Sequence, residues 1–257
     1  MRIPAFIRLT FRNISVNTDP GTMFFMLGLP AFYLLVLGIM FQGIIPSIGI
    51  NNESISYTKF LAPGIVGMQA FTAGNIGGGM LWSDRRWGMF EQLMVGPFRR
   101  TDYLLGIISV SIIFSLGGSA IMMVLATFIA GGFSLSVLSS LYLVLSLVAG
   151  TILFSSLFLI LSILVRTMQA YNTLTILLFF ILDFASTAFY PITSETPEAL
   201  RIISSLNPLS YVANIVRDSM VYGIGLSTAY QMLLITVIMV VLFVISLRLY
   251  KNVQTGL

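Results

Sequence analysis

The side chains that could take part in chemistry are concentrated in one loop, from Asp84 to Arg100, between two long apolar segments. Acidic, basic and aromatic residues alternate along this loop, which is long enough to form a compact helix. Such a mixture can bind a protein surface through ion pairs and apolar contacts. In a chain this apolar, we expect the loop to be the docking site for a partner in the cytosol.

Catalysis by this chain is not expected. Cys and His are both absent, which excludes disulfides, thiol chemistry, Cys/His zinc sites and haem ligation by His. A serine intramembrane protease needs a His or Lys base at membrane depth. An aspartyl protease needs two facing carboxylates, and only Asp183 lies well inside an apolar run. We therefore predict no catalytic residue, bound cofactor or metal site.

The phosphate-binding pattern Gly-x-x-x-x-Gly-Lys-Ser/Thr is absent from the chain. Hydrolysis of ATP by that route would have to take place on another subunit. If the chain drives uphill transport, its energy must come from such a subunit or from an ion gradient.

The composition indicates an integral membrane protein. Hydrophobic residues make up 57% of the chain and charged residues 9%, whereas soluble domains are about a quarter charged. The net charge is +4, but the basic residues lie at the edges of apolar runs and form no stripe with interleaved aromatics. Nucleic acid is therefore not an expected partner, and the lipid bilayer is.

The expected fold is an all-α bundle of six transmembrane helices. A helix needs roughly 20 apolar residues to cross about 30 Å of hydrocarbon, whereas a membrane barrel would show short alternating segments. The segments of sufficient length lie near 22–45, 59–81, 103–130, 138–165, 170–190 and 228–250.

The distribution of Lys and Arg predicts the orientation, because cytosolic loops carry the excess. One side holds ten of these residues: Arg2, Arg8, Arg12, Arg85, Arg86, Arg99, Arg100, Arg166, Arg248 and Lys251. The other side holds three: Lys59, Arg201 and Arg217. We therefore expect a multi-pass protein of the cell membrane. Both of its termini and the loop after the second span should lie in the cytosol.

The N-terminal arm, Ile3 to Val16, has the pattern of an amphipathic helix lying in the membrane interface. Its apolar side chains, Phe6 and Leu9 among them, alternate with Arg8 and Arg12. The alternative is a charged anchor that only fixes topology. Asp19-Pro20-Gly21 is expected to end this helix before the first span.

The loop after the second span predicts a helix of about three turns over Asp84–Val95, ended by Gly96-Pro97. A solvated charged loop is the alternative reading. That alternative would not need the apolar side chains found there, which are Trp87, Phe90, Leu93 and Met94. We expect them to contact a partner surface or the headgroup layer.

The segment Pro191–Ser227 is too long for a turn and too polar for a span. It predicts two short helices, Pro197–Leu206 and Leu209–Tyr222, with Asn207 as the cap of the second and Pro208 in its first turn. Short helices that re-enter the outer leaflet need protein around their ends. They could form an outer gate or a purely structural cap.

Asp183 lies within Phe180-Ile181-Leu182-Asp183-Phe184, at membrane depth. A carboxylate there is a candidate intramembrane polar site, because its cost must be offset by a partner or a water-filled cavity. The alternative is a neutral carboxyl group that hydrogen-bonds a neighbouring span. Gly74 and Gly78, four residues apart, are expected to permit close helix contact.

Three places in the chain resemble the membrane subunits of ABC-2 type exporters, which include drug-resistance permeases of the daunorubicin kind and nodulation-factor export permeases. The loop sequence Asp84-Arg85-Arg86-Trp87-Gly88, then Glu91-Gln92-Leu93 and Gly96-Pro97-Phe98-Arg99, is similar to the family's acidic, Arg, Gly, Glu, Leu, Pro and basic pattern. Leu61-Ala62-Pro63-Gly64 resembles the family's start of span two. Phe189-Tyr190-Pro191-Ile192, Pro197, Leu206-Asn207-Pro208-Leu209 and Arg217 resemble its outer loop. Met89 and Arg86 depart from the pattern, where Thr and an acidic residue are usual.

The resemblance implies a permease that pairs with a separate ATP-binding subunit and with a second permease copy or paralogue. ATP and Mg²⁺ would be bound by the partner subunit. The ATPase-coupling residues would be Asp84, Arg85, Gly88, Glu91 and Leu93, and the outer gate would comprise Tyr190, Pro191, Asn207, Pro208 and Arg217. Residues 1–257 would form one ABC-2 type domain: a cytosolic arm (1–21), spans one to five (22–190), an outer gate segment (191–227), and span six with a cytosolic tip (228–257).

Two other functions stay open from the sequence. One is a gradient-driven secondary transporter or channel, which predicts inverted repeats and several membrane carboxylates. The other is a non-transport assembly subunit. The substrate of an exporter could be an amphipathic drug, a lipid or a glycoconjugate.

Overall fold

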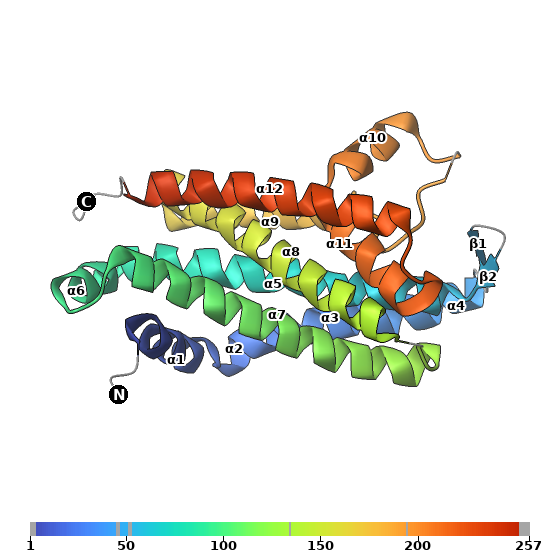
Figure 1. The fold of residues 1–257 in the computed structure, drawn as a ribbon, viewed down its shortest axis with the longest axis horizontal. Helices are drawn as coiled ribbons and strands as arrows, with labels where there is room; N and C mark the ends of the chain where they lie inside the picture. The colour runs from blue at the N-terminus through green and yellow to red at the C-terminus, as the bar shows by residue number, and fades with distance from the viewer. Residues whose placement is uncertain (1–3, 45–46, 51–52, 134, 194, 252–257) are drawn as a thin grey trace.

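The structure is a computed structural model that describes residues 4–44, 47–50, 53–133, 135–193 and 195–251. Its long helices run along one common axis (Figure 1). The short helix α6 (Met89–Val95) and the helix α1 (Ala5–Asn17) lie at one end, and the hairpin β1–β2 and helix α10 (Glu198–Leu206) lie at the other. The end that holds α6 is called the coupling end below, and the opposite end the far end.

The first apolar segment forms one helical stretch, Pro20–Ile44. It consists of α2 (Pro20–Met23), the π-helical η1 (Phe24–Gly28), α3 (Leu29–Phe32), the π-helical η2 (Tyr33–Leu37) and α4 (Gly38–Ile44). Pro30 has no N–H to donate to the carbonyl of Met26, which accounts for the wider turn at η1.

Asp19 separates this stretch from α1, as the sequence predicts. The carboxylate of Asp19 accepts hydrogen bonds from the backbone N–H of Thr22 at 3.0 Å and from its hydroxyl at 2.6 Å. The hydrogen bond from the Thr22 hydroxyl, more than any other cause, lowers the pKa of Asp19 below its ordinary value. The cap therefore starts the new helix with a charged residue outside the apolar stretch.

The remaining long helices follow in order. They are α5 (Tyr57–Arg86), α7 (Arg100–Ala130), α8 (Val137–Leu164), α9 (Met168–Phe184) and α12 (Leu226–Lys251). Within the described residues, four stretches are long and apolar enough to cross a membrane: Pro20–Ile44, α7, α8 and α12. The chain is therefore an all-helical membrane protein, apart from one small hairpin.

Helix α5 is the centre of the bundle, with α7 and α8 packed along it. At 30 residues it is long enough to span, but it falls outside the four apolar stretches. Its interior location explains this, because most of its residues contact protein. A span enclosed by other helices gains more from small residues than from lipid-facing ones.

Glycines in α5 let α8 approach closely, as the sequence predicts. A Cβ atom placed on Gly74 would lie 2.6 Å from the Cβ of Phe154, and one on Gly78 would lie 2.4 Å from the Cβ of Phe158. No ordinary Cβ contact is that short, so the two helices pack backbone to side chain at these positions. The expected role of Gly74 and Gly78 is confirmed.

Helix α9 is shorter than the predicted span 170–190, because it ends at Phe184. The Ser186 hydroxyl donates to the carbonyl of Asp183 at 2.7 Å and closes the helix there. The chain then turns inward, so that the carbonyl oxygen of Ala188 would lie only 2.1 Å from a Cβ on Gly64. Residues 185–190 are thus a packed turn rather than the end of a span.

The far end carries the segments between the spans. A two-stranded antiparallel hairpin, β1 (Ile48–Ile50) and β2 (Glu53–Ile55), was not predicted. The predicted first helix of 191–227 is α10, and the second is α11 (Pro208–Arg217) continued by the π-helical η3 (Asp218–Tyr222). The Asn207 side chain accepts from the backbone N–H of Leu209 at 2.9 Å, which confirms the predicted cap.

Candidate functional site

Helix α1 packs across the first turns of α7 at the coupling end. Leu9 is buried, and Gly106 of α7 lets it approach so closely that a Cβ on Gly106 would lie 3.0 Å from the Leu9 Cβ. The guanidinium of Arg8 lies 5.2 Å from the ring centre of Phe98. The predicted helix is confirmed for Ala5–Asn17, its place in the membrane interface stays a prediction, and Arg2 and Ile3 lie outside the described residues.

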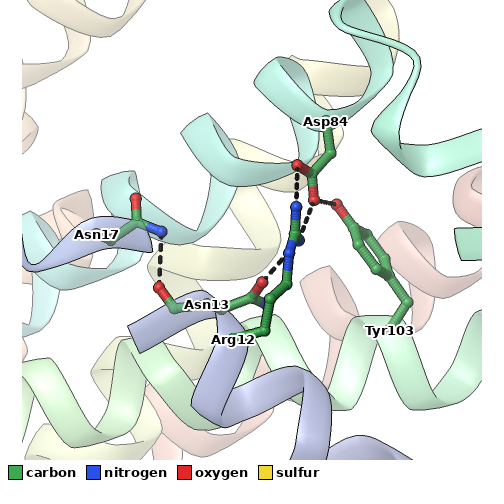
Figure 2. A network of polar contacts seen from close by, with 5 residues as sticks. All are labelled: Arg12, Asn13, Asn17, Asp84 and Tyr103. Carbon is green, nitrogen blue, oxygen red and sulfur yellow. Dashed lines mark hydrogen bonds and ion pairs between the residues drawn. The ribbon is translucent and has the colours of Figure 1, made fainter. Parts of the chain in front are cut away.

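A polar network joins α1, α5 and α7 (Figure 2). The Arg12 guanidinium donates to both carboxylate oxygens of Asp84, at 2.8 and 3.1 Å, and the Tyr103 hydroxyl donates to the same carboxylate at 2.8 Å. The hydrogen bond to Asp84 is the main cause that raises the pKa of Arg12 above its ordinary value. Asp84, at the end of α5, therefore attaches the N-terminal helix α1 to α5 and contacts α7 as well.

The predicted helix over Asp84–Val95 is wrong in its extent. Asp84, Arg85 and Arg86 form the last turn of α5, and α6 begins only at Met89 and has seven residues. Gly88 separates the two helices with φ of +68°, in the left-handed region that other residues rarely adopt. The predicted end of the helix before Gly96-Pro97 is confirmed.

Arg85 connects α5 to α8. Its guanidinium donates to the backbone carbonyl of Ser162 at 3.0 Å, in the last turn of α8. A cation at a helix C-terminus is favourable, because the last carbonyls have no partner within the helix. A displacement of the α5–α6 turn would therefore move the end of α8 or break this hydrogen bond.

The sequence analysis expected the apolar side chains of this region to face a partner or the headgroup layer, but some of those on α6 point into the bundle. Phe90 is fully buried, with ring centres 5.3 Å from Tyr103 and 6.0 Å from Tyr250. Leu93 is partly buried against the same cluster. The contacts of Phe90 therefore hold this short helix against α7 and α12.

Several apolar side chains at the coupling end are exposed, and two of them flank α6. Trp87, in the turn before α6, is 78% exposed, and Val95, at the end of α6, is 90% exposed. Glu91 lies between them in sequence, and its Oε2 atom is buried without a hydrogen-bond partner among the described residues. A buried carboxylate oxygen without a donor is costly unless a partner supplies one.

The coupling end thus has a short helix packed against the bundle, an exposed Trp87 side chain, and a Glu91 carboxylate oxygen without a hydrogen-bond donor among the described residues. Residues 5–221, from α1 to η3, match the sequence model of the ABC-2 type transporter family. The chain belongs to this family. An ABC-2 domain is a membrane transport component, and partners with ATP-binding subunits are usual in the family.

A relative of this ABC-2 family chain comes from Porphyra purpurea and carries the name "Putative transport permease ycf38". The two proteins are 28% identical over 208 residues, which cover 79% of this chain and 69% of the relative. The similarity agrees with the family match and supports a transport permease.

The far end of this ABC-2 chain is organised around Arg217, a predicted gate residue. Its guanidinium is buried and donates to the carbonyl of Phe60 at 3.2 Å, to the carbonyl of Thr187 at 2.7 Å and to Asn214 Oδ1 at 2.8 Å. The same guanidinium lies 3.9 Å from the ring centre of Phe60. Arg217 therefore ties α11 to α5 and to the turn after α9.

The other predicted gate residues lie near this centre. The Asn207 amide donates to the carbonyl of Leu182 at 2.7 Å, next to Pro208 at the start of α11. Tyr190 and Pro191 border an apolar cavity of about 390 Å³ together with Tyr57. The structure thus brings all five predicted gate residues to the far end.

Asp183 lies at the end of α9 rather than in the middle of a span. It is fully buried, and neither carboxylate oxygen has a hydrogen-bond partner among the described residues. Asp183 is therefore separate from the polar network at the coupling end.

The sequence analysis missed the partners of Asp84. Arg12 was assigned only to the membrane interface, and Tyr103 was not singled out. A signal existed, because opposite charges at the same end of neighbouring segments often pair, and a tyrosine at a helix end can donate to such a pair.

Proposed function

We propose that this ABC-2 chain is the permease subunit of an ATP-driven exporter in the cell membrane, with six spans and both termini in the cytosol. A separate subunit binds ATP and Mg²⁺ and hydrolyses the nucleotide. The two remaining spans in this proposal are α5, which has the length, and α9, whose 17 residues are extended by the packed turn.

The observation that carries this proposal is the coupling end. Glu91 has a buried oxygen for which the described part of the chain supplies no donor, and Trp87, four residues before it, is exposed. A docking partner with a basic or hydroxyl side chain would donate a hydrogen bond to the Glu91 carboxylate and cover the Trp87 ring. The ATP-binding subunit is the partner that the family resemblance implies.

The proposed mechanism passes motion from α6 to the spans through fixed contacts. Phe90 attaches α6 to α7 and α12, Arg85 attaches the α5 terminus to α8, and Asp84 attaches it to α1. Closure of the ATPase on ATP would move these elements together. In this mechanism Asp84, Arg85 and Leu93 transmit the motion, Gly88 provides the turn, and Glu91 contacts the partner.

The far end would act as the outer gate. Arg217 and Asn207 hold α11 against α5 and α9, so that opening requires these hydrogen bonds to rearrange together. The substrate would be amphipathic and would cross between this chain and a second permease copy or paralogue.

Purification of the tagged chain from its native membrane in a mild detergent tests this function. We expect an ATP-binding protein with a Walker motif to co-purify in stoichiometric amount, and the Glu91→Ala/Trp87→Ala variant to lose it. Arg201→Ala, which changes an exposed side chain on α10 at the far end, is the control and should retain the partner.

A chain that purifies alone, folded and without ATPase activity, would contradict the proposal. It would favour the second candidate, a gradient-driven transporter, for which the buried and unpartnered carboxylate of Asp183 is the supporting observation.

A further inference from the structure

The coupling end contains a cavity of about 580 Å³ between α1, α5 and α9. It begins beside the Arg12–Asp84 pair shown in Figure 2 and extends to Phe25 of η1. Phe179 of α9 packs against Phe25 and Phe71, with ring centres 6.3 and 5.8 Å away, and borders no part of the cavity. Aromatic contacts thus separate the cavity from the far end.

The charged groups around this cavity are already satisfied by the chain. Arg12 is paired with Asp84 through two hydrogen bonds, and Asp19 caps α2 through Thr22. These charges comprise one cation and two carboxylates. An anionic ligand would therefore meet no free positive charge and would be repelled by the carboxylates.

Uncharged polar groups of the cavity are not satisfied. The Asn13 side chain is 2% exposed, and its oxygen accepts from Arg12 at 2.9 Å, but its Nδ2 donor has no partner among the described residues. The hydroxyls of Tyr171 and Thr175, one turn apart on α9, are buried and lie near each other, but neither has a partner with ordinary hydrogen-bond geometry among the described residues. Groups of this kind cost free energy unless a ligand or water completes them.

Apolar side chains form the rest of the lining. The Trp82 ring stacks on Tyr171, with centres 6.0 Å apart and planes at 24°, and Phe25 lies at the opposite limit. Phe25 is 41% exposed on the surface of the first apolar stretch. One cavity therefore offers hydrogen bonds near α1 and an apolar path toward the bilayer.

We infer that this cavity binds the uncharged, hydroxyl- or amide-bearing headgroup of an amphipathic lipid, as the first binding site of the exported substrate. The inference rests on the proposed permease function and names its substrate class. Asn13, Tyr171 and Thr175 bind the headgroup, and the acyl chains leave past Phe25.

The sequence provides an internal reporter for this site. The chain has two Trp residues, and one of them, Trp82, borders the cavity. In a Trp87→Phe background, the fluorescence of Trp82 alone reports contact with a bromine quencher. The full chain in phosphatidylcholine nanodiscs is titrated with two probes brominated near the headgroup: a glucosyl diacylglycerol, which is uncharged, and phosphatidylglycerol, which is anionic.

We expect the glucosyl lipid to reach half-quenching at a mole fraction about tenfold lower than phosphatidylglycerol, which corresponds to one or two completed hydrogen bonds. Asn13→Leu and Tyr171→Phe should each remove most of this preference. Tyr230→Phe, which deletes an exposed hydroxyl on α12, is the matched control and should keep it. Free maltose should not displace the lipid probe.

Equal quenching by both lipids, stronger quenching by phosphatidylglycerol, or an unchanged preference in Tyr171→Phe would overturn the inference. Displacement by free maltose would overturn its lipid part. The assay needs no ATPase, so a failure here leaves the co-purification result intact. A chain that binds the lipid but no ATP-binding partner would contradict only the proposed function.

Discussion

At the scale of single residues, the buried polar groups of this chain fall into two classes. Arg217 donates hydrogen bonds to three oxygens of the chain, whereas Glu91 and Asp183 have carboxylate oxygens without a donor among the described residues. A satisfied group stabilises the fold, but an unsatisfied one costs free energy in the isolated chain. This difference separates structural residues from candidates for contact with a partner.

Glu91→Ala is expected to lower coupled export by about tenfold, because a hydrogen bond to a charged group contributes about 1.5–3 kcal/mol. ATP hydrolysis by the complex should persist, since this chain supplies no ATPase group. Transport and hydrolysis are measured together in proteoliposomes. Glu198→Ala, an exposed carboxylate on α10, is the control, and full coupling in Glu91→Ala would count against its docking role.

Arg217→Lys is expected to destabilise the chain by about 3 kcal/mol, although the charge is kept. An ammonium group cannot reach the carbonyls of Phe60 and Thr187 in the fork geometry of guanidinium, so buried acceptors lose their donor. Unfolding in mixed micelles with increasing dodecyl sulfate measures the change. The exposed Arg201→Lys should stay within about 0.5 kcal/mol of the parent, and similar stability of both variants would refute the argument.

The residue-level predictions from sequence succeeded where local chemistry decides. Asn207 caps α11 because Asn followed by Pro favours a helix start in almost any surroundings. The partners of Asp84 were missed because they come from residues 72 and 19 positions away, and their meeting depends on helix packing.

At the scale of elements, α5 determines how the bundle packs. Its glycines admit α8, its last turn holds α1, and its terminus leads directly into α6. Because α5 is enclosed by protein, its composition is less apolar than that of the four stretches that meet the criteria for a span. Tests of the elements therefore begin with the contacts of α5.

Gly78→Ala is expected to push α5 and α8 apart and to destabilise the chain by about 1–3 kcal/mol, since the added methyl group would overlap Phe158. Gly117→Ala on α7 is the matched control, because nothing lies within 4 Å of a Cβ at that position. The same dodecyl sulfate titration applies. Equal midpoints for the two variants would show that α8 can move aside without cost.

The attachment of α1 to α5 can be measured with a double-mutant cycle of Arg12→Gln and Asp84→Asn. The pair is partly exposed, at 28% and 15% for the two side chains, so solvent screening limits its coupling energy to about 1 kcal/mol. Thermal stability in nanodiscs supplies the four values. Strictly additive effects would mean that the contact does not hold α1 in place.

The sequence predicted which segments are helical more accurately than where they stop. The length of the apolar runs placed α7, α8 and α12 to within a few residues. Gly88 was expected to lie inside a helix, yet its left-handed conformation separates α5 from α6. The end of α9 at Phe184 follows from the contact between Gly64 and Ala188, which joins residues far apart in the chain.

At the scale of the whole molecule, the two ends of the bundle differ in the way expected if one end binds a partner and the other responds to its motion. At the coupling end, Trp87 is exposed and Glu91 has a buried oxygen without a donor among the described residues, whereas at the far end the buried Arg217 donates three hydrogen bonds. Helix α5 runs from one to the other, since Arg217 contacts its first turn and Arg12 contacts its last. In the proposed mechanism, motion received at α6 would therefore have a continuous path through α5 to the far end.

The most direct test of this account is photo-crosslinking in the native membrane, with a photoreactive amino acid at Trp87. The account predicts that this position traps an ATP-binding protein. The same probe at Leu206, which is 73% exposed on α10 at the far end, should trap none. Failure at position 87, or equal trapping at both positions, would contradict the claim that the coupling end receives an ATPase.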